Sequence, residues 1–234
     1  MAARGKDPKG AKALILYQHY PLAVDIKSMP IGVPTVSWRE PGTPAEQARY
    51  IDIYNRLHRA RVLLLGSDLD DELANQLVGC LIYNTSEDPK KRNFLYINSP
   101  GGAIGCGLML ADIVNYVSCG VTTVCAGTAA SMASYVLCNG NRGYRYSLPN
   151  SFTMIHQPSG GSAGQGADLE KEAQHVERMR DRVIGTYAAI TGQSREIITL
   201  DMDRDKYLDA DQTKEFGLTD AVTVTIPRAN PPRG

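Results

Sequence analysis

Two runs of residues decide the fold of this chain: Ala126-Gly-Thr-Ala-Ala-Ser131-Met-Ala-Ser-Tyr135 and Leu148-Pro-Asn-Ser-Phe-Thr-Met-Ile-His156-Gln-Pro158. Ser131 comes after a short apolar strand expected at 121–125 and heads an apolar helix expected over 132–137. A turn from strand to helix can hold a hydroxyl in the open, at the positive end of the helix. His156 ends a β-like run, and histidine is the usual base for such a hydroxyl. The pattern therefore predicts nucleophilic serine chemistry.

Both residues also have an ordinary structural explanation. A serine at a strand–helix junction is often only an N-cap, and a lone histidine after a strand is usually a packed polar residue. Serine chemistry further needs a third group that orients the imidazole, and hydrogen-bond donors for the oxyanion. The rest of the chain has to supply both.

Composition narrows the class of protein. The 234 residues carry 25 basic and 25 acidic side chains, so the charge gives no indication of a nucleic-acid partner. The apolar runs fall short of the roughly 20 residues that span a bilayer, and Ala13–Tyr17 is too short for a secretory segment. The 5 cysteines are scattered among apolar residues without a Cys-x-x-Cys pair. This predicts reduced core thiols in a reducing compartment and no structural metal.

Strands and helices alternate along the chain at intervals of about 25–35 residues, which predicts an α/β fold with parallel strands and right-handed crossovers. Expected strands cover 62–65, 94–97, 121–125, 143–146 and 152–155, with a last strand near Val224; expected helices cover 46–60, a segment holding Leu73 to Leu81, a segment ending near Val117, 132–137, 168–191 and a short segment through Phe216. Residues 1–45 are expected to form an extended N-terminal arm, 46–226 one domain, and 227–234 a flexible tail.

A glycine-rich excursion at 159–167 cannot pack a core, and a long amphipathic helix is expected after it, from Asp168 to Thr191. The apolar stripe of this helix consists of Leu169, Ala173, Val176, Val183 and Tyr187. A long helix beyond a flexible segment suggests an oligomer contact. An ordinary surface helix packed on the domain explains the pattern equally well.

Gly101 and Gly102 follow one expected strand and precede a helix, so their backbone N–H groups can face an anion. An oxyanion or a phosphate would both suit such donors. The glycine spacing does not match a dinucleotide fingerprint, and no ribose-binding acid ends the next strand. This argues against a phosphate.

Four motifs resemble those of the ClpP family, serine peptidases that degrade proteins handed over by a ring-shaped AAA+ ATPase. The motifs are Asn98-Ser-Pro-Gly-Gly102, Ala126-Gly-Thr-Ala-Ala-Ser131-Met132, Leu148-Pro-Asn-Ser151 and Met154-Ile-His156-Gln-Pro158. The resemblance covers about residues 30–225, with the motifs in the family's order and spacing. It implies a ClpP/crotonase-like β-α-β spiral with a protruding strand–helix handle over about 157–191.

The resemblance also implies the site residues. Ser131 matches the nucleophile, His156 the general base and Asp205 the acid. The backbone N–H groups of Gly102 and Met132 match the oxyanion donors. No metal and no organic cofactor are implied.

Four aspartates are candidates for the carboxylate that orients the imidazole. From the residues alone, the carboxylates in this part of the chain could all be solvated loop residues: Asp201, Asp203, Asp205 and Asp209. The family's motif favours Asp205. Arg204 beside it matches an arginine that makes a salt contact between the two rings, although a plain surface arginine fits the pattern too.

The resemblance implies partners as well. ClpP subunits, with ClpR-type relatives in mixed assemblies, form two stacked heptameric rings around a closed chamber, and an AAA+ Clp ATPase feeds them unfolded proteins; neither nucleic acid nor membrane is involved. Phe94 and Tyr96 match positions in the clefts where ATPase loops dock. A buried strand face is the alternative, and alternation favours it for at least one of them.

The chain departs from the family's pattern at Thr128, often Gln, and at Ala133-Ser134-Tyr135, often Gly-Ala-Phe. Alanine at 133 is expected to tighten the space behind the nucleophile. Met29-Pro-Ile-Gly-Val-Pro34 looks like the opening of plastid ClpP-type chains, which implies the chloroplast stroma, with a bacterial-type cytoplasm as the alternative. Residues 1–28 could be part of a transit segment, a lineage-specific arm at the pore, or a sequence added in cloning.

Two other functions compete with an active peptidase subunit. One is a largely structural, ClpR-like subunit whose triad is present but poorly aligned. The other is a crotonase-type acyl-CoA enzyme, which shares the spiral and the paired N–H groups but does not need Ser131, His156 and Asp205 together.

Overall fold

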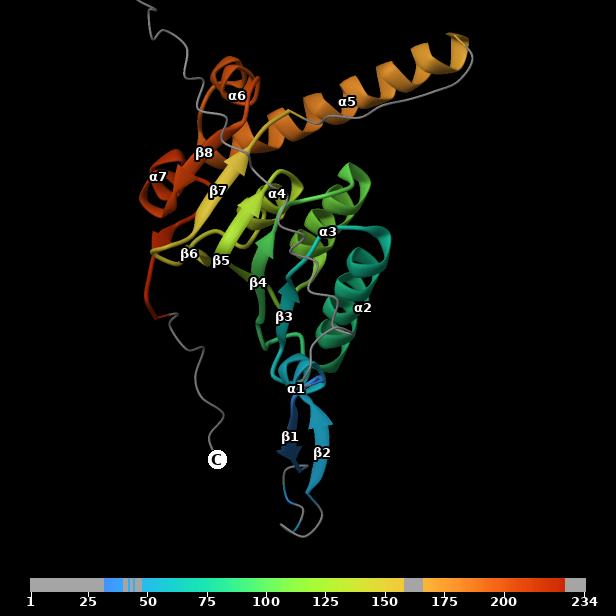
Figure 1. Ribbon diagram of the computed structural model, residues 1–234, viewed down its shortest axis with the longest axis vertical. Coiled ribbons are helices and arrows are strands. Elements are labelled where there is room, and N and C mark those ends of the chain that lie inside the picture. Colours follow the sequence, from blue (N-terminus) through green and yellow to red (C-terminus); the bar gives the residue numbers. More distant parts are fainter. Residues whose placement is uncertain (1–31, 40–41, 43, 45–47, 158–165, 226–234) are drawn as a thin grey trace, which may run out of the picture.

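The computed structural model describes residues 32–39, 42, 44, 48–157 and 166–225, without the side chains of 166–169. The elements follow in the order β1 (Thr35–Trp38), β2 (Arg49–Asp52), α1 (Ile53–Arg59), β3 (Val62–Leu65), α2 (Asp71–Glu87), β4 (Asn93–Ser99), α3 (Ile104–Tyr116), β5 (Val121–Ala130), α4 (Met132–Cys138), β6 (Arg145–Ser147), β7 (Phe152–Ile155), α5 (Gly166–Thr191), α6 (Arg195–Asp201), β8 (Lys206–Asp209), α7 (Ala210–Phe216) and β9 (Ala221–Val222). The β1–β2 ribbon and α5 project from opposite ends of the body (Figure 1).

The main sheet is parallel along the path β3-β4-β5-β6-β9, as the alternation of strands and helices predicts. β5 is long enough to pair twice. Its first half lies beside β6, with Thr123 opposite Arg145, and its last residues lie beside β7, with Ala130 opposite Met154. β8 then adds to β7 in the antiparallel direction. The sheet therefore turns at β5, and the ends of β5 and β7 come out side by side.

The core lies between this sheet and helices α2, α3 and α4. Apolar side chains recur at helical spacing on α2, where Leu77 and Leu81 are buried, and alternate along β4, where Leu95 and Ile97 are fully buried. Every residue of α4 is buried, which explains its continuous apolar sequence. The helix that begins beside Ser131 is therefore held rigidly by the core.

The N-terminal part differs from the prediction. The expected helix over 46–60 is wrong at its start, because residues 49–52 form β2, which pairs with β1 in an antiparallel ribbon. Asp52 then caps a shorter α1 through the N–H of Asn55 at 2.9 Å. Part of the stretch expected as an extended arm, 35–38, is likewise a strand. Residues 1–31, and with them the proposed transit or pore segment, lie outside the described residues.

Two further strand boundaries differ from the prediction. The strand expected to end at Cys125 continues to Ala130, because its last residues gain β7 as a partner. The strand expected at 143–146 begins at Arg145 instead. The short strands at 62–65 and 152–155 lie where their apolar patterns predict them.

Among the described side chains of the long helix α5, those that are buried lie near its C-terminal end. Val183, Ile184 and Tyr187 are buried, whereas Ala173 is exposed and Val176 is half-buried; the side chain of Leu169 lies outside the described part. Gly192 follows the helix with φ +76°, a left-handed conformation that favours glycine at a helix stop. Most of the glycine-rich excursion expected at 159–167 lies outside the described residues, as does the tail at 227–234; residues 166 and 167 begin α5.

A partly buried ion pair between Arg145 and Asp220 lies at the C-terminal end of the sheet. The Asp220 carboxylate accepts hydrogen bonds from the Arg145 guanidinium, at 2.5 and 3.0 Å, and from the backbone N–H groups of Gly143 and Arg145 at 2.8 and 2.9 Å. Burial acts to raise the pKa of Asp220, but these bonds and the charge of Arg145 outweigh it and hold the pKa below its ordinary value. The pair ties β6 to the chain that leads into β9.

Replacing this carboxylate gives a test of the fold. Asp220→Asn is expected to lower the free energy of unfolding at neutral pH by about 1–2 kcal/mol, because Arg145 then stays buried without its counter-charge. Since the folded-state pKa lies below the ordinary 3.8, this stability is complete above pH 3.8 and is lost as pH falls through the folded-state pKa. Denaturant unfolding at several pH values measures the difference from the unchanged protein, which should shrink in acid. Asp112→Asn, on an exposed side chain of α3, is the control; equal losses in the two variants would contradict the account.

Candidate active site

Ser131 occupies a sharp turn between β5 and α4. Its backbone has φ +53° and ψ −126°, a conformation that L residues rarely adopt, and its N–H donates to the Met154 carbonyl of β7 at 2.9 Å. Such strained residues persist only where the surroundings hold them. Here the buried α4 on one side and the β5–β7 pairing on the other fix the turn. The hydroxyl emerges at the N-terminal end of α4.

His156 and Asp205 are brought together by an antiparallel strand pair. β7 and β8 pair with Ile155 opposite Lys206, so the next residue on one strand meets the preceding residue on the other. His156 leaves the end of β7 and Asp205 stands just before β8. The N–H of Gln157 also donates to the Met202 carbonyl at 2.7 Å, which fixes the chain beyond the histidine.

The three side chains form a continuous hydrogen-bonded row. His156 Nε2 lies 2.9 Å from Ser131 Oγ, and His156 Nδ1 lies 3.1 Å from Asp205 Oδ1. A carboxylate can only accept, so Nδ1 carries the proton, and Nε2 is left to accept the serine proton. The side chains of His156 and Asp205 are 27% and 54% exposed, so the row opens to solvent on the carboxylate side.

The neighbouring carboxylates have other tasks. Asp201 pairs with Lys206 at 2.6 Å, and the side chain of Asp209 caps α7 by accepting from the N–H of Gln212 at 2.8 Å. Asp203 is exposed. Of the four acids that the sequence offered, Asp205 is the one that contacts the imidazole.

Two residues whose backbone N–H groups have no acceptor in the structure's backbone hydrogen bonds, Gly102 and Met132, line the cavity at Ser131. Met132 N–H belongs to the first turn of α4, whose N–H groups have no acceptor within the helix. Gly102 faces Leu69 in a β-bridge that uses the Gly101 carbonyl and the Ala103 N–H, which leaves the Gly102 N–H outside the bridge. Both residues line the cavity at Ser131, so the pair is placed to donate to an oxyanion.

Glycine is required next to these donors. A Cβ on Gly101 would stand 2.6 Å from the Ala130 carbonyl oxygen and 2.7 Å from Ser131 Cβ, and its φ is +96°. The loop therefore touches the nucleophile turn directly. Ser99 assists by accepting the Gly101 N–H at 3.1 Å, a contact for which the Asn-Ser-Pro-Gly-Gly motif was the available sequence signal.

Asn98 has a supporting role that the sequence did not reveal. Its Oδ1 accepts the N–H of Thr128 at 3.1 Å and would stand 2.6 Å from a Cβ on Gly127. The bond reaches the backbone of residue 128, so it does not depend on which side chain stands there. This explains how threonine fits where the family often has glutamine.

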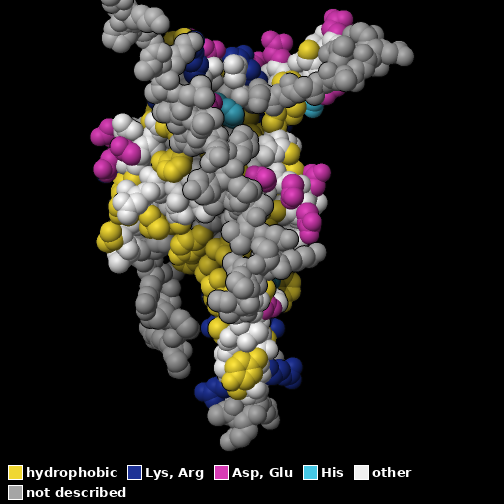
Figure 2. Space-filling model, in the orientation of Figure 1, with side chains coloured by type: hydrophobic (Ala, Val, Ile, Leu, Met, Phe, Trp, Pro, Cys, Tyr) yellow, Lys and Arg dark blue, Asp and Glu magenta, His cyan; other side chains and the backbone are white. Residues whose placement is uncertain are grey.

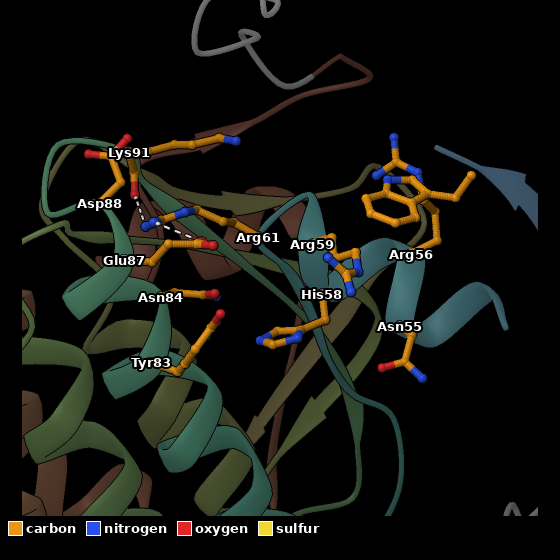
Figure 3. A pocket seen from close by; sticks show the side chains of 11 residues that line it. Asn55, Arg56, His58, Arg59, Arg61, Tyr83, Asn84, Glu87, Asp88 and Lys91 are labelled. Carbon is orange, nitrogen blue, oxygen red and sulfur yellow. Dashed lines mark hydrogen bonds and ion pairs between the residues drawn. The ribbon is translucent and has the colours of Figure 1, made fainter. Parts of the chain in front are cut away.

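The cavity over the nucleophile is small, about 70 Å³, and is lined by Gly102, Ile104, Ser131, Met132, His156, Val183 and Tyr187. A larger cavity of about 590 Å³ opens between α1 and α2 (Figure 3). It is rich in basic side chains, but Arg61, which lines it, already donates to the Lys91 carbonyl at 2.6 Å and faces Glu87 at 3.7 Å. The small cavity is the one that holds a hydroxyl hydrogen-bonded to an imidazole.

The structure places the other predicted residues without joining them to the site. Arg204 is exposed beside Asp205. Phe94 and Tyr96 are half-buried on the face of β4 opposite the core, where Leu64 of β3 is 37% exposed next to Tyr96. Figure 2 shows hydrophobic side chains gathered over this part of the sheet. The alternative of a buried strand face, which alternation favoured for at least one of the two aromatic residues, is wrong, because both lie half-buried on the other face.

Burial keeps at least two of the thiols, those of Cys125 and Cys138, protonated at neutral pH. All five cysteines are free, and burial raises the pKa of Cys138 to about 12 and that of Cys125 to about 11. In the described part of the chain, no three His, Cys, Asp or Glu side chains gather as metal ligands would. None of the helices described there has the length and apolarity to span a bilayer.

A serine, a histidine and an aspartate in a hydrogen-bonded row, with two N–H donors at a glycine turn and a helix start, define the class of serine hydrolases on an α/β scaffold. The sequence profile of the Clp protease family matches residues 45–225. The chain belongs to the Clp protease family, and it is a serine peptidase of that family.

Its relatives carry matching names. It is 51% identical over 196 residues to an "ATP-dependent Clp protease proteolytic subunit" of Chlorella vulgaris, covering 84% of this chain and 96% of the relative. The same name belongs to a protein of Oltmannsiellopsis viridis, 50% identical over 197 residues, with 84% and 100% covered. A "proteolytic subunit 1" of Gloeobacter violaceus is 45% identical over 194 residues, with 83% and 97% covered. These relatives do not favour the ClpR-like alternative, and the family match argues against an acyl-CoA enzyme.

Gly101→Ala tests the contact between the glycine loop and the nucleophile turn. The added Cβ must push against the Ala130 carbonyl and Ser131, so peptide hydrolysis is expected to fall by about 100-fold or more. Steady-state cleavage of a fluorogenic peptide measures the loss. Gly105→Ala is the control, because a Cβ there meets nothing within 4 Å and alanine favours the helix. Full activity of Gly101→Ala would show that the contact does not matter.

Proposed function

We propose that this chain hydrolyses peptide bonds with Ser131 as the nucleophile, His156 as the general base and Asp205 as the carboxylate that orients the imidazole. The observation that carries the proposal is one imidazole bonded on both sides, at 2.9 Å to the hydroxyl and at 3.1 Å to the carboxylate. A packed histidine or a capping serine would not need this arrangement; Ser131 in fact makes no side-chain cap bond to α4.

The reaction follows from these positions. Ser131 Oγ attacks the peptide carbonyl as its proton passes to His156 Nε2, and Asp205 stabilises the imidazolium that forms. The N–H groups of Gly102 and Met132 donate to the oxyanion of the tetrahedral intermediate. His156 then protonates the leaving amine, and a water molecule, activated by the same imidazole, releases the acyl group. Apart from substrate and water, each step uses side chains and backbone groups of this chain, so the proposal includes no metal or organic cofactor.

The membership in the Clp protease family implies work with Clp ATPases in an oligomeric ring. We further propose two stacked heptameric rings, composed of this chain alone or with other ClpP/ClpR-type subunits, into whose chamber an AAA+ ATPase feeds unfolded polypeptides. The described outer part of α5 supports this, because Ala173 is exposed and Val176 only half-buried, and a long helix with apolar residues left partly uncovered is suited to a contact between copies. Arg204 is proposed to contact the opposite ring, and Phe94 and Tyr96 to receive the ATPase loops.

The cellular location is proposed from the organisms of the relatives. Chlorella vulgaris, Oltmannsiellopsis viridis and Nephroselmis olivacea supply chains 50–51% identical to this one, and these are green algae. We propose the chloroplast stroma. Fractionation of cells that make the tagged protein tests this, and recovery outside the plastid fraction would contradict it.

The triad assignment is tested by three variants. Ser131→Ala is expected to abolish peptide cleavage and labelling by a fluorophosphonate while assembly persists. Asp205→Asn is expected to lower kcat by about 10²–10⁴-fold, because the imidazole loses the partner that sets its tautomer. Asp203→Asn, two residues away and exposed, is the control and should keep activity within about twofold. Unchanged kcat in Asp205→Asn, or labelling of Ser131→Ala, would contradict the assignment.

The assembly and docking proposals are tested by a matched pair of variants. Arg204→Ala is expected to convert double rings to single rings, visible in native mass spectra, with peptide cleavage reduced as well. Tyr96→Ala is expected to keep both the double ring and peptide cleavage but to lose most of the ATPase-driven degradation of a folded protein. Each variant controls for the other. The proposals fail if Arg204→Ala remains in double rings, or if Tyr96→Ala degrades protein at the normal rate.

A further inference from the structure

A second row of hydroxyl groups reaches the nucleophile turn from behind. The phenol of Tyr187, on α5, lies 2.7 Å from the Oγ of Ser134, on α4. The Ser134 Oγ in turn lies 2.6 Å from the backbone carbonyl oxygen of Ser131. Ser134 is fully buried and Tyr187 is 2% exposed, so these bonds are shielded from water.

The direction of the protons in this row can be deduced. A hydroxyl has one hydrogen to donate, and a carbonyl oxygen can only accept. The hydrogen of Ser134 therefore goes to the Ser131 carbonyl, and the Tyr187 phenol must be the donor to Ser134. Burial raises the pKa of Tyr187 well above its ordinary value, which keeps that donor protonated. The row thus runs from the Tyr187 O–H through Ser134 to the Ser131 carbonyl.

The acceptor at the end of this row belongs to the strained residue. Ser131 has φ +53°, and its carbonyl is also bonded to the N–H groups of Ser134 and Tyr135 at 3.0 and 3.3 Å. The hydroxyl bond, at 2.6 Å, is the shortest of the three. A carbonyl held from three directions fixes the peptide plane of Ser131, and with it the direction in which the Oγ points toward His156.

An adjacent pair offers a comparison within the same two helices. The phenol of Tyr135 donates to the Thr186 hydroxyl at 3.1 Å, and Thr186 donates onward to the Arg182 carbonyl at 3.1 Å. The rings of Tyr135 and Tyr187 meet edge to face with centroids 5.7 Å apart. The Tyr135–Thr186 pair joins α4 to α5, as the Tyr187–Ser134 pair does. Its hydrogen bonds end at a carbonyl within α5 and do not reach Ser131.

We propose that Tyr187 is a positioning residue for the peptidase reaction: acting through Ser134, its phenol holds the Ser131 carbonyl and so aligns the nucleophile. The proposal rests on the proposed function, in which Ser131 attacks the substrate. It makes the base of α5, the helix that projects from the body, part of the support of the active site. It also gives a task to Ser134, which stands where the family often has alanine.

The experiment compares two variants that each remove one phenolic hydroxyl. Tyr187→Phe is expected to lower kcat and the second-order rate of Ser131 labelling by a fluorophosphonate by about 3- to 30-fold, with KM within about twofold, because the ring that lines the cavity remains. Tyr135→Phe removes the row that does not reach Ser131 and should change both rates by less than about twofold. Equal losses in the two variants, or a Tyr187→Phe defect confined to KM, would overturn the proposal.

Ser134→Ala breaks the same row from the other helix and keeps the proposal falsifiable if Tyr187→Phe fails to fold. Its labelling rate should fall to a similar extent. The double variant Ser134→Ala/Tyr187→Phe should be labelled about as fast as the slower of the two single variants, because both changes break one row. Losses that multiply would mean that the two hydroxyls act separately, which overturns the row. If the unchanged protein is not labelled at Ser131, the proposed function itself fails; if it is labelled and both phenol variants match it, only the positioning role fails.

Discussion

The structure depends on β5 pairing with two strands in succession. Its first half continues the sheet beside β6, and its last residues lie beside β7, so the chain that follows β5 emerges next to the end of β7. Ser131 follows the one strand and His156 the other, and β8, antiparallel to β7, delivers Asp205 to the same edge. Three side chains that are distant in sequence meet because β5 and β7 end, and β8 begins, at the same edge of the sheet.

The strained backbone at Ser131 is maintained by groups that lie outside the hydrogen-bonded triad. The Met154 carbonyl of β7 accepts the Ser131 N–H, and Ser134 donates to the Ser131 carbonyl. Both peptide groups of the residue are therefore fixed, and the Gly101 loop fills the remaining space against Ser131 Cβ. A positive φ of this kind costs about 1–3 kcal/mol, and the surrounding bonds offset that cost. This backbone conformation leaves the Ser131 hydroxyl without a cap bond to α4.

Sequence reasoning succeeded where burial sets a local pattern. The short apolar runs at 62–65 and 152–155 are strands as predicted, and the glycines at 101–102 form a turn before a helix. The expectation that both glycine N–H groups face an anion is wrong for Gly101, whose N–H donates to Ser99 Oγ. It failed where structure depends on a distant partner: residues 49–52 become a strand only because 35–38 lie beside them, and β5 is longer than its apolar core because β7 extends it. The choice of Asp205 among four acids came from the family resemblance, and the row from Tyr187 to Ser131 has no local signal, because its hydroxyls lie on different helices.

The central claim is that a hydroxyl, an imidazole and a carboxylate act together beside two backbone donors, and a crystal structure of the protein after reaction with a fluorophosphonate tests it most directly. The account predicts a bond from phosphorus to Ser131 Oγ, with the phosphoryl oxygen about 2.7–3.1 Å from the N–H nitrogens of Gly102 and Met132. A structure in which another side chain carries the phosphorus, or in which the phosphoryl oxygen points away from both N–H groups, would contradict it.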